Sequence, residues 1–196
     1  MTDTEQIERA AAAIDRGDLV VYPTETVYGL GGHALRPAAI ERVFTVKDRD
    51  RSEPISLAVP NVNAAEPYVS LTDQERAFME TFLPGPVTVV AEKRPAVPNL
   101  LTAGREKVGV RVPDHDLALA LLEAVAPLTA TSANVSGRPS ARTTADLDPE
   151  IRDAAAVVLD GGRTGGTGST VVDVEAGTII REGAMAERVA TWLEEH

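Results

Sequence analysis

Short β-branched runs alternate with amphipathic segments along the whole chain, and this alternation limits most strongly what the sequence can fold into. Strands are predicted at 19–21, 55–59, 87–91, 108–112, 128–131, 156–159, 170–174 and 178–180. Helices are predicted at 4–16, 37–46, 72–82, 114–125 and 184–195. The pattern predicts an α/β (mixed α+β) fold with a twisted, largely open mixed sheet of about seven or eight strands and flanking helices.

Length and composition set the class of protein. A chain of 196 residues with 43% hydrophobic residues is long enough for a substantial core, and we expect a single domain over 1–196. The sequence has no apolar run of about 18 residues and no signal peptide, so we expect a cytoplasmic protein with no membrane partner. It has no cysteine, which excludes disulfides and a thiolate nucleophile. Its three histidines have no ligand spacing.

The chain is strongly acidic, with 30 acidic against 19 basic residues and a formal net charge of −11. This charge disfavours indiscriminate binding to nucleic-acid backbones or anionic membranes. A site for an anion therefore has to be built locally from a few basic residues.

The run YPTETVYGLGG, residues 22–32, follows the first predicted strand. Thr24 and Thr26 place hydroxyl groups at a strand end, and the glycines allow close approach of the backbone to bound atoms. A small ligand fits such a loop. A glycine-rich turn between two strands explains the same residues equally well.

A basic segment follows the second predicted helix. In an extended backbone, side chains alternate, so Lys47, Arg49 and Arg51 would share one side and grip a phosphate chain. The alternative is a solvated loop whose charges pair with one another.

The segment 129–137 follows an apolar strand and carries Ser132 and Asn134, with Arg138 and Arg142 just downstream. These short polar side chains either contact a ligand or cap their own backbone. Arg111 lies within an apolar strand, where an arginine needs a partner. An anionic ligand and an internal salt bridge are equally good partners.

A glycine-rich segment at 161–170 offers backbone amides that would cradle a phosphate, although it lacks the lysine and spacing of a P-loop. A flexible hairpin loop is the alternative.

Taken together and in order, these clusters resemble the YrdC-like family, in particular its short threonylcarbamoyl-AMP synthases. The resemblance rests on YPTETVYGLG, the pair Lys47 and Arg49, PGPVT, VGVRVPDH, TSANVSG, GSTVVD and REG, which span most of the chain from Tyr22 to Gly183. Each motif alone is weak, but the ordered set is specific. It favours a ligand site over the structural alternatives for the separate clusters.

The resemblance implies a fold with a concave, positively charged ligand cleft and an ATP-dependent nucleotidyltransferase. The enzyme would condense L-threonine with bicarbonate or CO₂ to threonylcarbamoyl-AMP and pyrophosphate. A threonylcarbamoyl-transferase partner would then modify the adenosine next to the anticodon in tRNA. Magnesium is expected with ATP, without an assigned protein ligand. Direct binding of tRNA is left open.

The resemblance also implies roles for individual residues. Lys47 and Arg49 would be catalytic and hold the ATP phosphates. The further residues expected near ATP are Asn134, Arg142 and Arg181. Those expected near threonine are Thr24 or Thr26, Arg111, which would bind the carboxylate, Ser132 and Ser169.

The sequence departs from the commonest family pattern at three positions, Asp50, Glu53 and Ala58. The resemblance also leads us to expect no additional C-terminal domain. Two other functions stay open: an RNA-binding module of the same fold without chemistry, and a related carbamoyl-transfer or maturation protein.

Overall fold

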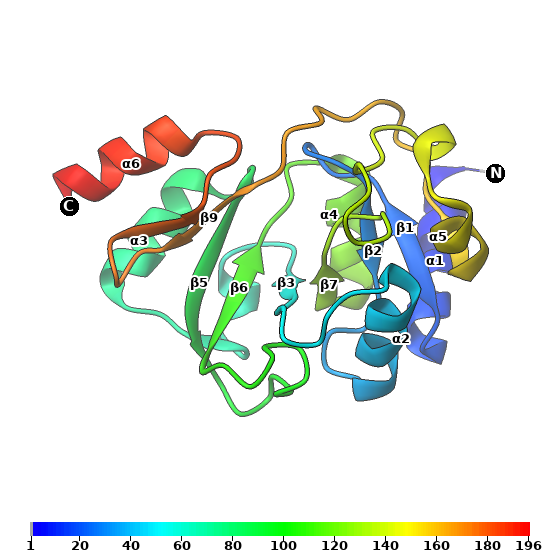
Figure 1. The fold of residues 1–196 in the computed structure, drawn as a ribbon, viewed down its shortest axis with the longest axis horizontal. Helices are drawn as coiled ribbons and strands as arrows, with labels where there is room; N and C mark the ends of the chain where they lie inside the picture. Colours follow the sequence, from blue (N-terminus) through cyan, green and yellow to red (C-terminus); the bar gives the residue numbers. More distant parts are fainter. Residues whose placement is uncertain (1) are drawn as a thin grey trace.

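A computed structural model describes residues 2–196 and contains the predicted alternation of helices and strands (Figure 1). The helices are α1 (Asp3–Arg16), α2 (Pro37–Lys47), α3 (Asp73–Phe82), α4 (Asp116–Val125), α5 (Pro149–Ala154) and α6 (Ala186–Glu195), with 3-10 turns at Asn63–Ala65 and Thr144–Asp146. The strands are β1 (Leu19–Tyr22), β2 (Gly29–Gly31), β3 (Ser56–Ala58), β4 (Val69–Ser70), β5 (Val87–Lys93), β6 (Lys107–Arg111), β7 (Leu128–Ala130), β8 (Ala155–Val158), β9 (Thr170–Asp173) and β10 (Thr178–Arg181).

Within residues 2–196 the strands form two sheets. A seven-stranded mixed sheet has the order β10-β9-β5-β6-β3-β7, with β4 paired to β5. A three-stranded sheet has the order β2-β1-β8. Figure 1 shows β5, β6 and β9 with α3 and α6 in one part of the molecule, and β1 and β2 with α1, α2 and α5 in the other. This confirms the predicted fold class, with the strands divided between two sheets.

Strand β1 is buried on both faces, which explains why its sequence is continuously apolar. Leu19 and Val21 belong to the large core that extends under the seven-stranded sheet. Val20 and Tyr22 point the other way, into a second core formed mainly with α1 and α4. The residues that follow β1 are therefore held between two packed layers.

The two sheets meet where β2 runs beside β7. The N–H of Leu30 donates to the main-chain oxygen of Thr131 over 2.9 Å, and the N–H of Thr129 donates to that of Gly32 over 2.8 Å. The loops that leave β1 and β7 consequently lie next to each other. Strand β2 consists of Gly29, Leu30 and Gly31, and its two glycines made it unrecognisable as a strand in the sequence.

Helices α1 and α3 begin at capping boxes. The capping box predicted from Thr72 and Glu75 is present at the start of α3. The short helix α5 and the two-residue strand β4 were not predicted, although Asp148 followed by Pro149 is a local start signal for α5. No helix within residues 2–196 is long and apolar enough to span a membrane.

Candidate functional site

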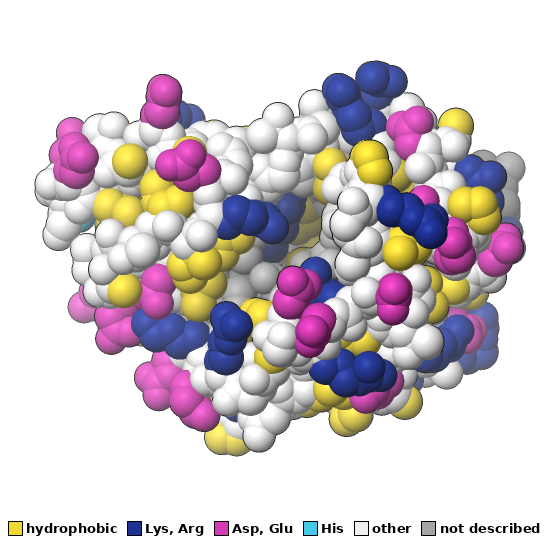
Figure 2. Space-filling view, viewed as in Figure 1, with side chains coloured by type: hydrophobic (Ala, Val, Ile, Leu, Met, Phe, Trp, Pro, Cys, Tyr) yellow, Lys and Arg dark blue, Asp and Glu magenta, His cyan; other side chains and the backbone are white. Residues whose placement is uncertain are grey.

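A cavity of about 330 Å³ opens between the two parts of the molecule. Figure 2 shows the surface hollowed there, with basic side chains inside and beside the hollow. None of the described residues that line the cavity is Asp or Glu, whereas its basic residues are Arg49, Arg105, Lys107, Arg111 and Arg181. In a chain with a formal net charge of −11, this concentration of positive charge indicates a site built for an anion.

Arg111 is placed in the cavity by the alternation of β6. Val108 and Val110 are buried in the core, whereas Lys107, Gly109 and Arg111 face the cavity. A glycine is required in the middle of this row, because a Cβ at Gly109 would overlap the side chain of Ser56. The row therefore brings the guanidinium of Arg111 against the loop that follows β1.

The Arg111 guanidinium binds that loop through one nitrogen. Nη2 lies 2.9 Å from Oε1 of Glu25 and donates to Oγ1 of Thr26 over 2.6 Å. The other Glu25 oxygen, Oε2, accepts from the N–H of Asp114 over 3.2 Å. An internal salt bridge thus partners Arg111 in the wall of the cavity, as one of the two sequence interpretations predicted.

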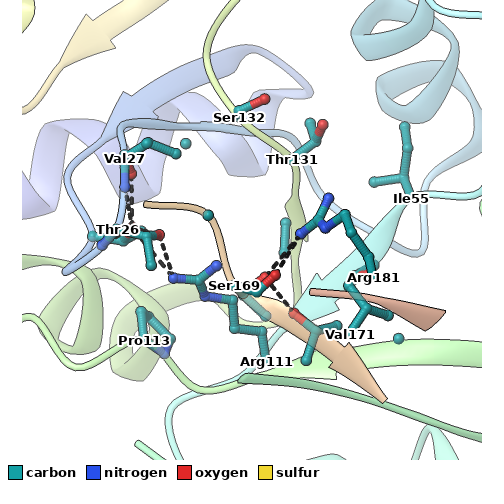
Figure 3. A pocket seen from close by; sticks show the side chains of 18 of the residues that line it. Thr26, Val27, Ile55, Arg111, Pro113, Thr131, Ser132, Ser169, Val171 and Arg181 are labelled. Carbon is teal, nitrogen blue, oxygen red and sulfur yellow. Dashed lines mark hydrogen bonds between the residues drawn. The ribbon is translucent and has the colours of Figure 1, made fainter. Parts of the chain in front are cut away.

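The hydroxyls of Thr24 and Thr26 lie 2.9 Å apart, and Arg111 Nη2 donates to both, over 3.5 Å to Thr24 and 2.6 Å to Thr26. Figure 3 shows Thr26 beside the Arg111 guanidinium. Thr24 Oγ1 donates to the main-chain oxygen of Val27 over 2.7 Å and accepts from the N–H of Thr26 over 3.2 Å, so it closes its own turn. Thr26 Oγ1 is the hydroxyl that lies against Arg111. Both threonines line the cavity, and Thr26 makes the shorter contact with the Arg111 guanidinium.

Arg181 enters from the edge strand β10 beside Ser169. Its Nη2 donates to the main-chain oxygen of Ser169 over 2.9 Å and to Oγ over 3.1 Å, and Ser169 Oγ lies 3.0 Å from Oγ1 of Thr88. Burial, followed by the nearby charges of Arg111 and Arg49, lowers the pKa of Arg181 from its ordinary value. The three arginines therefore repel one another, and an anion among them would relieve that repulsion.

Arg49 reaches the cavity from the loop after α2. Its Nη1 lies 3.3 Å from Oε2 of Glu53, and its Nη2 donates to the main-chain oxygen of Pro54 over 3.0 Å. The segment 47–51 is not extended, because α2 continues to Lys47 and Asp48 ends it in the left-handed region. Arg51 consequently points away and pairs with Glu41 at 2.7 Å.

Lys47 is not a surface residue of the cavity. It is only 1% exposed, and it does not line the cavity. Its Nζ donates to the main-chain oxygens of Ser132 and Asn134, the latter over 2.7 Å. Burial, and then the charge of Arg49, lowers the pKa of Lys47 to about 8. Lys47 therefore holds the loop after β7.

Ser132 of that loop lines the cavity, whereas the side chain of Asn134 bonds within the loop. Asn134 Nδ2 donates to the main-chain oxygens of Val135 and Arg138 over 2.9 and 2.8 Å, and Asn134 does not line the cavity. Its amide caps its own loop, as the structural alternative predicted.

Arg142 and the glycine-rich segment support each other outside the cavity. Arg142 Nη2 donates to the main-chain oxygen of Gly165 over 3.2 Å, and its side chain crosses Gly166, whose φ is +91°. The N–H groups of Gly165 and Gly166 donate to the main-chain oxygens of Glu25 and Thr26 over 3.2 and 2.6 Å. These two amides are occupied, so they do not form the predicted phosphate cradle. Farther along the segment, Gly168 and Ser169 line the cavity.

Several lining residues were not predicted. They are Ser56, Thr88, Arg105, Lys107, Thr131 and Ser140. The period-two alternation of KVGVR places Lys107 on the same face as Arg111, and this signal was present in the sequence. Ser140 and Arg105 lie in loops, whose course such periodicity does not predict.

The cavity does not fit a resident divalent cation. The described residues contain no group of three or more His, Cys, Asp or Glu side chains that would hold a metal ion. The cavity wall offers hydroxyls and cations, whereas magnesium is normally bound through carboxylates, phosphates and water. We therefore assign no protein-held metal.

Comparisons with known proteins agree with this geometry. The threonylcarbamoyl-AMP synthase of Pyrococcus abyssi is 37% identical over 172 residues, which cover 86% of this chain but 51% of that protein. The threonylcarbamoyl-AMP synthase of Klebsiella pneumoniae is 34% identical over 186 residues, which cover 92% of this chain and 97% of that protein. The chain thus spans about half of the first relative and nearly all of the second.

A solved structure is also similar. The crystal structure of P. abyssi Sua5 complexed with L-threonine superposes with a TM-score of 0.87 at 33% identity, covering 96% of this chain and 58% of that one. The model of the Sua5/YciO/YrdC family, described as "Telomere recombination", matches residues 12–183. The chain belongs to the Sua5/YciO/YrdC family.

Proposed function

We propose that this protein is an L-threonylcarbamoyladenylate synthase that condenses L-threonine, bicarbonate or CO₂ and ATP to threonylcarbamoyl-AMP and pyrophosphate. The observation that carries the proposal is the cavity wall, which gathers five basic residues and no acidic one among the described residues of a net acidic chain. The names of the relatives and the threonine-bound structure of P. abyssi Sua5 support the choice of reaction.

The reaction needs such a wall because its partners are anions. The threonine nitrogen bonds to CO₂ and loses a proton, which gives a carbamate. A carbamate oxygen then bonds to the α-phosphorus of ATP, and the bond from that phosphorus to the bridging oxygen of the β-phosphate breaks, so that pyrophosphate leaves. Neutralising and aligning two anions supplies most of the catalysis in such a step.

Threonine is assigned to the Arg111 end of the cavity. The guanidinium offers a planar pair of donors to a carboxylate, and Thr26 holds it in place. Glu25 keeps Arg111 partnered when no substrate is bound. Ser132, Ser169 and Thr24 supply hydroxyl groups around the same space.

The phosphates of ATP are assigned to Arg181 and Arg49. Arg181 lies beside Ser169 and Arg111, where the carbamate has to meet the α-phosphate. Arg49 approaches from the opposite part of the molecule. Magnesium enters this scheme as part of the substrate, bound by the ATP phosphates rather than by carboxylates of the cavity.

Three residues that the resemblance assigned to ATP hold the loops of the cavity in place in this proposal. Lys47 and Asn134 fix the loop that carries Ser132, and Arg142 fixes the segment that carries Ser169. They are positioning residues in this proposal, because none of them lines the cavity.

The product would pass to a threonylcarbamoyl-transferase that modifies tRNA in the cytoplasm. The net charge of −11 disfavours a broad tRNA-binding surface on this chain, which argues against the RNA-binding alternative.

Release of pyrophosphate tests the proposal. ATP, threonine and bicarbonate are each omitted in turn from a reaction with purified protein, and the complete mixture alone is expected to release pyrophosphate. Release without threonine would contradict the proposal. Failure to release pyrophosphate, combined with salt-sensitive binding of RNA, would favour the non-catalytic alternative. Carbamoylation of a substrate other than threonine would favour the carbamoyl-transfer alternative.

A further inference from the structure

Charge pairing divides the basic residues of the cavity into two groups. Arg111 is paired with Glu25, Arg49 with Glu53, and Lys107 with Asp173 and Glu175. Within the described part of the chain, Arg181 and Arg105 form no ion pair with a carboxylate. Arg181 is already placed at the reacting end by its contact with Ser169. Arg105 is the second uncompensated positive charge, and no motif of the sequence pointed to it.

The backbone holds Arg105 at the mouth of the cavity. Its N–H donates to the main-chain oxygen of Thr102 over 3.0 Å, and Ala103 and Gly104 before it adopt φ values of 53° and 76°. The tight turn ends there. The next residue, Glu106, accepts from the N–H of Lys93 over 2.9 Å and begins the pairing of β6 with β5.

Arg105 lies in the turn before β6 and lines the cavity in line with the cavity-facing residues of that strand. Arg105, Lys107, Gly109 and Arg111 are spaced by two residues, and all four line the cavity. At about 3.3 Å per residue, Lys107 and Arg111 are about 13 Å apart along the strand, and Arg105 lies beyond Lys107. The row runs from the threonine end to the outer rim.

The loop of Arg49 lies next to the loop of Arg105. The N–H of Ile55, which follows the Arg49 segment, donates to the main-chain oxygen of Leu101 over 2.8 Å. The two arginines therefore approach the cavity from adjacent loops. Arg105 is exposed, and Arg49 is already paired with Glu53. A ligand that extends from Arg181 toward the rim would meet both.

We propose that Arg105 binds the terminal phosphates of ATP, and the pyrophosphate formed from them. The proposal rests on the proposed function. A nucleoside monophosphate has a single phosphate, which Arg181 accommodates at the reacting end, and it does not extend to the rim. Charge on the two further phosphates of ATP is what an arginine at the rim would recognise. Arg105 would thus distinguish ATP from AMP and hold the leaving group.

Calorimetric titration in buffer free of bicarbonate, where no turnover occurs, tests this assignment. AMP, ATP and inorganic pyrophosphate are each titrated into the wild-type protein and into the Arg105→Ala variant. The variant is expected to bind ATP and pyrophosphate about tenfold more weakly, and AMP with unchanged affinity. The Lys93→Ala variant is the matched control, because Lys93 has the same charge on the neighbouring strand, bonds to Asn99 and does not line the cavity.

Three results would overturn the assignment. Equal weakening of AMP and ATP would place Arg105 at the first phosphate, and unchanged ATP binding would remove it from the site. If Lys93→Ala weakened the binding of ATP and pyrophosphate as much as Arg105→Ala, the loss would reflect the overall charge of the protein and not a contact made by Arg105. If the wild-type protein binds neither ATP nor pyrophosphate, the proposed function itself fails, and that result is distinct because it appears before any substitution is made.

Discussion

Lys47 Nζ donates a 2.7 Å hydrogen bond to the main-chain oxygen of Asn134. The main-chain oxygen of Lys47 in turn accepts a 2.7 Å hydrogen bond from the N–H of Ser136. Lys47, at the end of α2, is therefore bonded through both its side chain and its main chain to the loop after β7, 87 residues away. The loop that delivers Ser132 to the cavity depends on this connection, and several consequences can be measured.

Replacing Lys47 with Met would remove the connection. The main-chain oxygens of Ser132 and Asn134 would lose their donor, so we expect the free energy of unfolding to fall by about 2 to 4 kcal/mol together with the activity. Urea denaturation and pyrophosphate release measure the two effects. The control is Arg49→Ala, which should lose activity while losing less than about 1 kcal/mol of stability. A Lys47→Met protein that is as stable as wild type yet inactive would show that Lys47 touches the substrate.

The same amine makes stability depend on pH. The pKa of Lys47 is about 8 in the folded protein, against an ordinary value of 10.5. Between these values the folded state binds fewer protons than the unfolded state, so the contribution of Lys47 to the free energy of unfolding rises with pH. We expect wild type to gain about 2 to 3 kcal/mol relative to Lys47→Met between pH 7 and pH 10. A difference that stays constant or shrinks would contradict the burial of a charged amine.

Replacing Gly166 should cost more stability than replacing Gly162, because the Arg142 side chain crosses Gly166. Gly162 and Gly166 both have positive φ, but a Cβ at Gly162 meets no neighbour, whereas one at Gly166 would overlap Arg142 Nε. We expect Gly166→Ala to destabilise by roughly 1 kcal/mol more than Gly162→Ala. The excess should disappear when Arg142→Ala is added, as chemical denaturation of the double variant will show. An excess that persists would assign it to the backbone instead.

The two threonines after β1 should respond differently to replacement by Val. Thr26→Val removes the acceptor for Arg111 and is expected to raise the KM for threonine about tenfold, with the KM for ATP unchanged. Thr24→Val opens the turn at Val27 and should lower stability by about 1 to 2 kcal/mol. Steady-state kinetics and denaturation of both variants distinguish the roles. The reverse pattern would assign threonine to Thr24.

Sequence patterns within one strand or one helix predicted those features that depend on that strand or helix alone. Arg111 was singled out because an arginine in an apolar strand needs a partner, and the structure supplies Glu25. Alternation along β6 also brings Lys107 to the same face. The capping box of Thr72 and Glu75 was read correctly for the same reason, since all its partners are within one turn.

The remaining features of the fold and the site depend on contacts between residues that are far apart in the sequence. The resemblance implied that Lys47 holds the ATP phosphates, whereas in the structure its amine bonds to main-chain oxygens of a loop that only the folded chain brings near. Asn134 and Arg142 bond to main-chain oxygens, and periodicity in the sequence carries no information about such partners. The two sheets meet at β2, and its two glycines kept it from being recognised by a pattern of apolar residues.

The most direct test of the account follows the carbon atom of bicarbonate. Wild-type protein is supplied with ATP, L-threonine and carbon-13 bicarbonate, and the nucleotide product is analysed by mass spectrometry. We predict threonylcarbamoyl-AMP that carries the heavy carbon, and none when threonine is omitted. Cleavage of ATP to AMP without a threonine- and bicarbonate-derived adduct would contradict the assignment of the cavity to this reaction.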